Sequence, residues 1–452
     1  MLRRKAERAI ADWLGRPGKA LLVTGARQVG KTYIVRETLR ERGIPCAEFN
    51  LIRDREALEI LRGHTSVDDL LMKLSLFSPT RLEPHRTVIF FDEIQEFPEI
   101  VTAVKFLVED GRFRYVLSGS MLGVELKGLR SAPVGYVETL TMYPLDFEEF
   151  LQLFGVTDGI WEMLRRCYRE RQPVDDAVHR KLTDIFSLYL IIGGMPAAVE
   201  AYRRTNSIDD VIVEHGSIIR QYRQDFTKYE EESRRLRLTR IYDIIPAELN
   251  EKNKRFLVSD VERGARLDRT EDSFLWLTAA GVAIAAYNVT EPALPLTLNR
   301  KMSLFKLFLS DVGMLTTMYG RSVKLDIVSG KAGINRGAVY ENAVAQELVA
   351  HGYDLSYYAS KRLGELDFVI EHAGKALPIE VKSGKDYARH SALDNVLAVP
   401  GYGIGEAYVF SPGNVSAEGK IVNYPAYMVM FLQEERGESG VLPISGFAFK
   451  DA

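Results

Sequence analysis

The feature that most constrains the fold is a glycine-rich segment near the N-terminus. The sequence ALLVTGARQVGKTYIVRETLRERG reads as a short apolar strand, the pattern Gly25-x-x-x-x-Gly30-Lys31-Thr32, and a stretch with apolar residues at helical spacing. In that context backbone N–H groups surround phosphate, Lys31 reaches the β- and γ-phosphates, and the Thr32 hydroxyl binds Mg²⁺. We therefore predict ATP and Mg²⁺ as cofactors, a catalytic role for Lys31, and nine nucleotide-binding residues: Gly25, Ala26, Arg27, Gln28, Val29, Gly30, Lys31, Thr32 and Tyr33.

A second segment, TVIFFDEIQEF, supplies acids directly after an apolar strand. Residues 88–91 form an unbroken apolar run, as expected of a buried parallel strand, and Asp92 and Glu93 follow it. Asp92 is predicted to hold the hydrated Mg²⁺ and Glu93 to polarise the attacking water. The alternative is a helix start that carries two acids favoured by the helix dipole. A third strand, in RYVLSGSM, ends at Ser118 and Ser120, and the sequence leaves open which serine senses the γ-phosphate.

These segments resemble a large prokaryotic family of AAA+-type ATPases whose C-terminal half is a domain of unknown function. The resemblance implies an α/β fold with a P-loop ATPase core built on a parallel sheet, a helical and winged-helix-like middle, and a restriction-endonuclease-like α/β domain at the C-terminus. It covers nearly the whole chain and rests on the segments GARQVGKT, FFDEIQ, VLSGSMLGVELKG, VETLTMYPLDFEEFL, YLIIGGMPAAVEAY, FKLFLSDVGML and NRGAVYENAVAQELVAHGYDL.

The predicted domain boundaries follow this layout. They are an ATPase domain at 1–155, a helical subdomain at 156–232, a winged-helix-like domain at 233–300, a linker at 301–332 and the restriction-endonuclease-like domain at 333–452. One departure from the family concerns a trans-acting arginine. Many relatives carry a basic residue where this chain has Tyr136, so Arg130 is the remaining candidate, and its alternative is a solvated surface residue.

Composition limits the other functional classes. The chain of 452 residues is 46% hydrophobic and 27% charged with a net charge of −3, as in a globular protein without general attraction to nucleic acid. The longest uncharged run, Phe274 to Thr290, is shorter than a membrane span and is interpreted as buried core. The start lacks a secretory pattern, and two cysteines are too few for a disulfide framework. We expect a cytoplasmic protein that makes no membrane contact.

The middle of the chain carries no predicted catalytic group. Residues 155–235 are rich in helix formers, and IIGGMPAAV indicates a bend between helices. The next stretch alternates helical periodicity with a β-prone end, which suits a winged helix. Between Ser233 and Thr270 there are 10 Lys or Arg against 6 Asp or Glu, an excess that would either meet DNA phosphates or form a solvated face.

A hairpin close to the C-terminus, GELDFVIEHAGKALPIEVKSGK, carries the second predicted site. If Ala373-Gly374 is a two-residue turn, residues whose numbers sum to 747 face each other, and Asp367 lies opposite Glu380. Opposed carboxylates repel unless a cation lies between them, and Mg²⁺ or Mn²⁺ would remove the repulsion. Lys382 shares a strand face with Glu380. Asp367, Glu380 and Lys382 are therefore predicted to be catalytic, with both acids as metal ligands.

Glu341 is the third predicted ligand of this metal. It shares a helical stripe with Val344, Ala345 and Leu348, so it should point inward with the apolar face. The alternative for the hairpin is a surface ladder in which Glu365 faces Lys382, and Pro378 suggests a strand close to an edge or a bulge.

Together these patterns predict an AAA+-type ATPase coupled to a metal-dependent nuclease domain that acts on DNA. The alternative is a nucleotide-dependent switch or scaffold whose C-terminal domain binds a partner without cleaving nucleic acid. ATP sites of this superfamily are often completed between subunits, so a homo-oligomer is expected by analogy.

Overall fold

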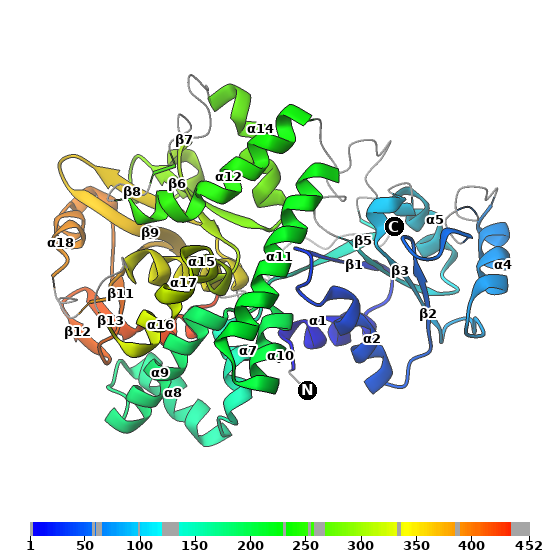
Figure 1. Cartoon of the computed structure of the whole chain (residues 1–452), viewed down its shortest axis with the longest axis horizontal. Coiled ribbons are helices and arrows are strands. Elements are labelled where there is room, and N and C mark those ends of the chain that lie inside the picture. The colour runs from blue at the N-terminus through cyan, green and yellow to red at the C-terminus, as the bar shows by residue number, and fades with distance from the viewer. Residues whose placement is uncertain are drawn as a thin grey trace, which may run out of the picture.

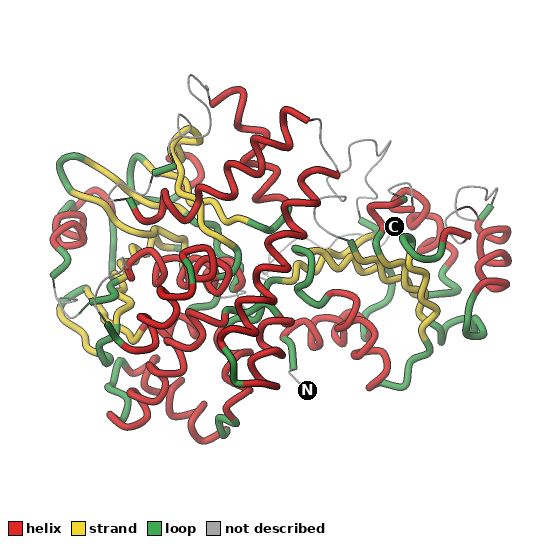
Figure 2. Tube along the Cα trace, viewed as in Figure 1, coloured by secondary structure: helices red, strands yellow, loops and turns green. Residues whose placement is uncertain are grey.

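Two β-sheets lie at opposite ends of the molecule, with helices between them. The computed structural model describes residues 3–56, 59, 66–97, 100–119, 135–228, 232–251, 255–256, 267–331, 336–384 and 389–434. Figure 1 shows the N-terminal sheet on the right, the C-terminal sheet on the left and the long helix α11 (Ile208–Lys228) between them. The strands in Figure 2 form the same two separate groups.

The N-terminal sheet is parallel, with its strands in the order β2-β3-β4-β1-β5. Leu21 and Val23 belong to one apolar core while Leu22 belongs to a second, because successive side chains of a strand point to opposite faces. This confirms the predicted parallel sheet. Its elements are α1 (Lys5–Leu14), β1 (Ala20–Gly25), α2 (Lys31–Glu41), β2 (Cys46–Asn50), α4 (Val67–Phe77), β3 (Val88–Asp92), η1 (Ile94–Glu96), α5 (Ile100–Asp110), β4 (Arg114–Ser118) and β5 (Val137–Met142).

Helices dominate the middle of the chain, as predicted. Gly193 ends α9 at a φ of 68°, which produces the predicted bend before α10. Within the described residues no single helix is long and apolar enough to cross a membrane, and only the pair α9 and α10, bent by 119°, meets those criteria by length and composition. The middle elements are α7 (Phe147–Leu151), η2 (Gln152–Phe154), α8 (Asp158–Glu170), α9 (Asp176–Ile192), α10 (Pro196–Thr205), α11, α12 (Glu232–Asn250) and α14 (Leu267–Ala279).

The C-terminal sheet is mixed and has eight strands in the order β12-β13-β11-β10-β9-β8-β6-β7. Its elements are β6 (Ala283–Val289), η3 (Leu296–Asn299), β7 (Arg300–Leu309), α15 (Val312–Tyr319), α16 (Arg321–Ser329), α17 (Arg336–Ala350), β8 (Ser356–Ser360), β9 (Gly364–His372), β10 (Lys375–Val381), α18 (Ser391–Leu397), η4 (Pro400–Tyr402), β11 (Ala407–Ser411), β12 (Ser416–Glu418), β13 (Ile421–Pro425) and η5 (Ala426–Phe431).

The junction between the predicted middle and C-terminal domains differs from the expectation. The sequence predicts a linker at 301–332, but this segment forms most of β7 together with α15 and α16, and residues 305–316 are buried. The predicted winged-helix-like domain is also not separate from the C-terminal sheet, because β6 pairs with both β7 and β8. The uncharged run from Phe274 onward lies mostly in the apolar core, as predicted.

The predicted register of the C-terminal hairpin is confirmed. The pairs of β9 and β10 run from Lys375 with His372 to Ile379 with Phe368, and the residue numbers of each pair sum to 747. Ala373 and Gly374 have φ values of 49° and 69°, the positive values that a two-residue hairpin turn requires. The expectation for Pro378 is wrong in one respect: β10 lies between β9 and β11, inside the sheet rather than near its edge.

Candidate nucleotide-binding site and C-terminal carboxylate cluster

The phosphate-binding loop depends on glycine at both ends. Gly25 ends β1 at a φ of 139°, and a Cβ at this residue would lie 2.2 Å from the backbone oxygen of Met142. Gly30 has a φ of 96° and precedes Lys31, the first residue of α2. Glycine adopts such backbone angles without strain, and at Gly25 a Cβ would also have no room. The loop therefore curves directly into the N-terminus of α2, as the sequence predicts.

Lys31 lies folded against its own loop. Its Nζ donates hydrogen bonds to the carbonyl oxygens of Gly25 and Ala26, at 3.1 and 2.8 Å. Burial lowers the pKa of Lys31 to about 8, against the opposing effect of the Glu93 and Asp92 charges. A bound phosphate would provide the opposite charge that two neutral carbonyls do not.

Asp92 lies at the end of β3 and receives hydrogen bonds from neutral groups only. The Thr32 hydroxyl lies 3.1 Å from both carboxylate oxygens, the Asn50 amide nitrogen lies 2.9 Å from Oδ2, and the Ser118 hydroxyl donates to Oδ1. Burial raises the pKa of this carboxyl. A hydroxyl and a carboxylate side by side form an oxygen donor set of the kind that Mg²⁺ prefers, so Thr32 and Asp92 fit this ion.

Sequence reasoning missed Asn50. This residue ends β2, and the strand register places it directly beside Asp92. A polar residue at the carboxyl end of the strand next to β3 was the available signal, because parallel strands bring such ends together. Of the two predicted serines, Ser118 contacts Asp92, whereas Ser120 lies outside the described residues.

Glu93 follows Asp92 in a left-handed backbone conformation, with a φ of 62°. Its side chain accepts a hydrogen bond from the Gln95 amide. Arg130, the predicted candidate for a trans-acting arginine, lies outside the described residues. The Tyr136 hydroxyl donates a hydrogen bond of 2.5 Å to Glu109.

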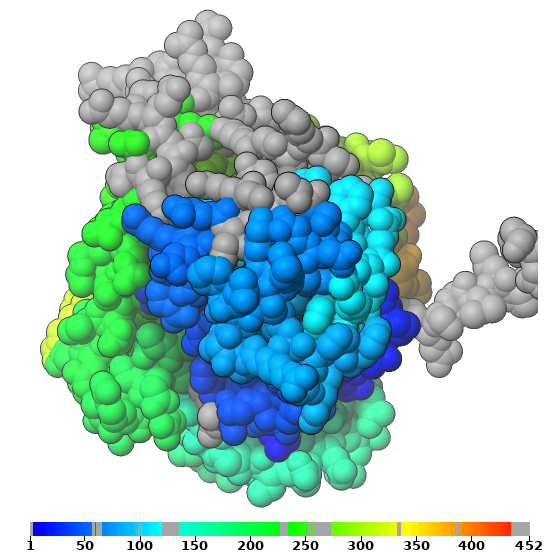
Figure 3. Space-filling view, turned by 90° about the vertical axis from the view of Figure 1, so that its right-hand side faces the viewer, coloured from blue at the N-terminus to red at the C-terminus, as the bar shows by residue number. Residues whose placement is uncertain are grey.

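Residues from distant parts of the chain hold the phosphate-binding loop. Arg27 forms an ion pair of 2.6 Å with Asp225 of α11, and the Tyr222 hydroxyl donates to the Arg27 carbonyl at 3.0 Å. On the other side, the Arg4 guanidinium donates to the Val29 carbonyl at 3.1 Å. Figure 3 shows the ATPase domain in blue and cyan with the green helical segment along one side of it. No local pattern indicated these contacts. Tyr33, by contrast, is half exposed.

In the C-terminal hairpin, the predicted catalytic residues bond to one another and to the backbone. Asp367 accepts a hydrogen bond of 2.8 Å from the Val381 N–H, and the Lys382 Nζ lies 2.6 Å from the Glu380 Oε1. Burial and the charge of Asp367 raise the pKa of Glu380 to about 8, although Lys382 opposes this shift. Among the described residues, none forms a hydrogen bond with the buried Glu380 Oε2.

Two further acids belong to this carboxylate cluster, which we define as Glu341, Glu365, Asp367 and Glu380. Glu341 is 2% exposed, so the predicted inward orientation is confirmed. The charge of Glu341 acts on Glu380 and on Lys382. Glu365 does not pair with Lys382, as the surface-ladder alternative supposed, but lies 2.6 Å from the Nζ of Lys306.

The cluster does not fit a metal ion in the arrangement described. Among the residues that the structure describes, no group of three or more His, Cys, Asp or Glu side chains lies close enough together to hold one. Instead, the ammonium groups of Lys306 and Lys382 contact Glu365 and Glu380. The predicted metal set of Glu341, Asp367 and Glu380 stays a prediction.

A large cleft adjoins the hairpin. It has a volume of about 1510 Å³ and lies where α9, the start of α17 and the carboxyl ends of β10 and β11 meet. Its lining includes His179, Lys181 and Arg336, together with Ser383 and Gly384, which follow Lys382 directly. Ligands of open α/β sheets commonly bind at the carboxyl ends of parallel strands.

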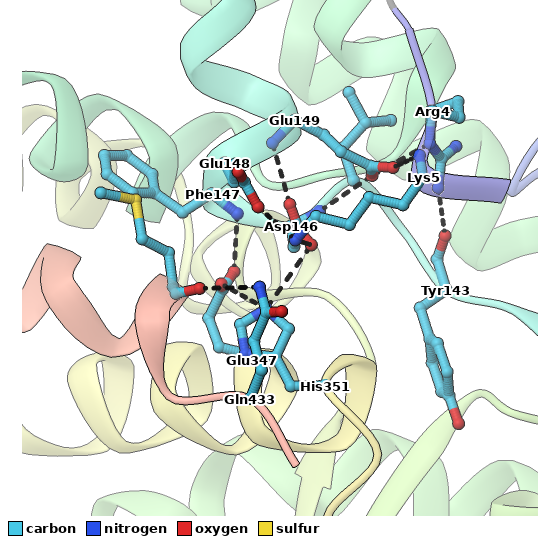
Figure 4. A network of polar contacts seen from close by, with 12 residues as sticks. Arg4, Lys5, Tyr143, Asp146, Phe147, Glu148, Glu149, Glu347, His351 and Gln433 are labelled. Atoms are coloured by element: carbon cyan, nitrogen blue, oxygen red, sulfur yellow. Dashed lines mark hydrogen bonds and ion pairs between the residues drawn. The ribbon is translucent and has the colours of Figure 1, made fainter. Parts of the chain in front are cut away.

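A buried polar network connects the ATPase end of the molecule with α17 (Figure 4). Asp146 lies 2.6 Å from the Lys5 Nζ and 3.5 Å from the His351 Nε2. Glu347, one turn before His351, accepts hydrogen bonds from the Phe147 N–H at 2.8 Å and from the Tyr189 hydroxyl at 2.9 Å. The start of α7 and α17 are thus held together by the buried side chains of Asp146, Glu347 and His351, whereas the Lys5 side chain is partly exposed.

Comparison with solved structures returned distant likenesses. The Walker-type ATPase Paby2304 of Pyrococcus abyssi is 16% identical with a TM-score of 0.41, over 71% of this chain and 96% of that chain. The Aeropyrum pernix Orc1 protein in complex with DNA is 16% identical with a TM-score of 0.30, over 73% and 93%. Cdc6p from Pyrobaculum aerophilum is 13% identical with a TM-score of 0.26, over 73% and 95%. No curated protein matches the chain.

Three family models match consecutive parts of the chain. Residues 17–151 match the model of an AAA domain. Residues 183–325 and 336–427 match two domains of unknown function, DUF8612 and DUF4143. The first match covers the parallel sheet, the glycine loop and the Thr32–Asp92 contact. The N-terminal part of the chain therefore matches an AAA domain in sequence, with a parallel α/β sheet and a glycine-rich loop.

Proposed function

We propose that this protein binds and hydrolyses ATP with Mg²⁺. The observation that supports the proposal is the placement of Lys31, Thr32 and Asp92 around one loop, with the Asp92 carboxylate bonded only by neutral donors. The hydrogen bonds of Lys31 and Asp92 described above thus go to neutral groups. The phosphates of ATP would bring a negative charge to Lys31, and Mg²⁺ would bring a positive charge to Asp92.

Each residue has a distinct task in this proposal. Lys31 would leave the carbonyls of Gly25 and Ala26 and donate to the β- and γ-phosphates. Thr32 and Asp92 would hold Mg²⁺, which supplies charge neutralisation at the phosphates when bound. Glu93 would accept a hydrogen bond from the attacking water and so orient it toward the γ-phosphate. The Ser118 hydroxyl, next to Asp92, would keep that carboxylate in position.

Two variants separate binding from turnover. We expect Lys31→Ala to lose nucleotide binding, and Glu93→Gln to bind ATP normally while phosphate release falls by about a hundredfold or more. Glu41→Gln, at the exposed end of α2, is the matched control and should hydrolyse ATP like the unaltered protein. Binding is measured with a fluorescent ATP analogue and turnover by release of inorganic phosphate. Unchanged turnover in Glu93→Gln would contradict its assigned role.

A second proposal concerns the C-terminal domain: cleavage of phosphodiester bonds in DNA. The hairpin supports it, because the pairing of β9 and β10 ends at Phe368 and Ile379, the neighbours of Asp367 and Glu380, and the Lys382 Nζ lies 2.6 Å from Glu380. The adjoining cleft carries Lys181 and Arg336. Lys382 would neutralise charge that develops on the phosphate. The competing function is a scaffold whose C-terminal domain binds a partner without cleavage.

Cleavage assays distinguish the two functions of the C-terminal domain. Single-stranded DNA, double-stranded DNA and RNA are incubated with the protein in Mg²⁺ or Mn²⁺, with and without ATP. Cleavage of DNA that Lys382→Ala abolishes, while ATP turnover survives, would support the nuclease. Intact substrates together with normal ATP turnover would favour the scaffold. Association into a homo-oligomer, measured by light scattering with ATP, is a separate prediction.

A further inference from the structure

Lys306 is a charged side chain in a place where burial of a charge is costly. It lies on β7, its side chain is fully buried, and its Nζ lies 2.6 Å from the Glu365 Oε1. The same Nζ lies 4.8 Å from the ring centroid of Tyr357. A buried ammonium is strongly unfavourable unless opposite charges surround it. Lys306 therefore requires negatively charged side chains close to its ammonium group.

The surroundings of Lys306 carry a negative charge that outweighs burial. Burial lowers the pKa of Lys306, but the charges of Glu341, Glu365 and Asp367 together raise it above its ordinary value. Three members of the carboxylate cluster thus act on one ammonium. Lys382, the other lysine at the cluster, is paired with the fourth member, Glu380.

The fold holds β7 against the cluster. The Asn342 side chain, next to Glu341 on α17, accepts a hydrogen bond from the Leu309 N–H at 2.8 Å and donates one to the Leu309 carbonyl at 3.0 Å. The ring of Phe308 packs against Phe368 of β9, with 5.5 Å between the ring centroids. Lys306 shares the strand face of Phe308, because side chains alternate along a strand. Its position is therefore fixed by packing on two elements that carry cluster acids.

These observations explain why the cluster does not fit a metal ion. Carboxylates that face one another need a cation between them, and the chain supplies two from its own side chains. We propose that Lys306 is the built-in cation of the C-terminal carboxylate cluster and excludes divalent cations from it while β7 stays in place. This inference concerns occupancy of the cluster: a metal-dependent nuclease would need a divalent cation there, so an Asp367-dependent Mn²⁺ site in the Lys306 protein would favour the nuclease and count against the inference.

Measurement of Mn²⁺ binding tests the proposal directly. The free Mn²⁺ signal in electron paramagnetic resonance is followed during titration of the nucleotide-free full chain, with Asp92→Asn in every sample to disable the ATP site. We expect Lys306→Met, which keeps the length of the side chain, to bind Mn²⁺ about tenfold more tightly or better than the Lys306 protein. Addition of Asp367→Asn should abolish the gained site.

Two controls define what the lysine contributes. Lys306→Arg keeps the charge and should bind Mn²⁺ as weakly as Lys306 does. Lys301→Met changes an exposed lysine of the same strand and should have no effect. An Asp367-dependent Mn²⁺ site of equal affinity in the Lys306 protein would overturn the proposal, and so would a folded Lys306→Met protein that gains no site.

Folding of the variant provides a second readout. Because Lys306→Met leaves carboxylates without their cation, its melting temperature should fall in chelator and recover in Mn²⁺. If it does not fold in chelator, recovery of the fold in Mn²⁺ supports the proposal. If Mn²⁺ fails to restore it, the Mn²⁺ titration is repeated on Lys306→Met with Glu365→Gln, and absence of an Asp367-dependent site in that protein would contradict the proposal.

Discussion

The two sites of this chain contain the same side-chain types, lysine and carboxylate, in opposite arrangements. At the ATP site Lys31 lies on backbone carbonyls, and Asp92 is bonded by hydroxyl and amide groups. In the C-terminal cluster, Lys306 and Lys382 each lie 2.6 Å from a carboxylate oxygen. At the ATP site the lysine and the carboxylate are hydrogen-bonded to neutral groups, whereas in the C-terminal cluster the lysines form ion pairs with the cluster's own carboxylates. The side-chain types alone therefore do not distinguish the ATP site from the C-terminal cluster.

The sharpest test of this difference removes one carboxylate charge from each site. Asp92→Asn takes away a predicted metal ligand, and we expect ATP turnover to fall by about a hundredfold or more, since a metal ion supplies several kcal/mol of transition-state stabilisation. Asp367→Asn should leave ATP turnover unchanged. Both proteins are measured by phosphate release at saturating ATP and Mg²⁺. If the two losses were equal, the sites would not be separate.

A second prediction concerns the junction on which both sites depend. A Cβ at Gly194 would lie 2.0 Å from the carbonyl oxygen of Leu145, and the Gly194 N–H donates to Asp311 at 2.6 Å. We expect Gly194→Ala to lower the free energy of unfolding by about 3 kcal/mol, because neither backbone segment can yield easily. The measurement is denaturant unfolding followed by circular dichroism.

The matched control for Gly194 is Gly159. It lies inside α8, and a Cβ there would meet nothing within 4 Å. Gly159→Ala should raise stability by about 0.5–1 kcal/mol, because alanine has the higher helix propensity. An equal loss in both variants would mean that loss of glycine, rather than the contact with Leu145, determines the outcome.

The third prediction uses the buried network between the two ends of the molecule. Burial and the Asp146 charge raise the pKa of Glu347 from 4.5 to about 7. Burial lowers the pKa of His351, but its hydrogen bond to Asp146 and the Glu347 charge raise it overall. The folded state therefore binds both protons more tightly than the unfolded state. Their contribution is present at low pH and is lost as pH rises through the folded-state pKa values.

Glu347→Gln isolates the glutamate's share. The amide oxygen can still accept the bonds from Phe147 and Tyr189, so the protein should fold. We expect the decline in melting temperature from about pH 5 to pH 8 to become smaller by about 2 °C, the shift that about 1 kcal/mol produces. The exposed Glu418, changed to Gln, is the control. A parallel pair of curves for the unaltered protein and Glu347→Gln would refute the assignment.

Features that depend on a few neighbouring residues could be predicted from the sequence. Glycine spacing identified the phosphate-binding loop, turn chemistry at Ala373-Gly374 predicted the hairpin register, and helical spacing predicted that Glu341 points inward. Each pattern repeats over a few residues and follows from backbone geometry. These patterns therefore sufficed to predict the parallel sheet, the phosphate-binding loop of the ATP site, and the hairpin and inward Glu341 of the C-terminal cluster.

Partners that come from far along the chain could not be predicted. Asp225 lies 198 residues from Arg27, and nothing near either residue indicates the other. The same holds for Lys306. The sequence predicts a linker for its segment, whereas the fold places this lysine on β7 in contact with Glu365. Tertiary packing decides such pairs. Because Lys382 is the one lysine of the cluster that lies on the hairpin, the sequence predicts a metal site where the fold brings a second cation, Lys306.

The smallest predicted effect sharpens the register of the hairpin itself. Ala373 has a φ of 49°, a conformation that costs an alanine roughly 1 kcal/mol and that asparagine adopts more readily. Ala373→Asn should therefore raise the free energy of unfolding by about 0.5–1 kcal/mol. Gly374→Ala, at a φ of 69°, is the control of opposite sign and should lower stability by a similar amount. Both are read from denaturant midpoints. If the two substitutions shifted the midpoint in the same direction, Ala373-Gly374 would not be a two-residue turn, and the pairing that sets Asp367 beside Glu380 would lose its support.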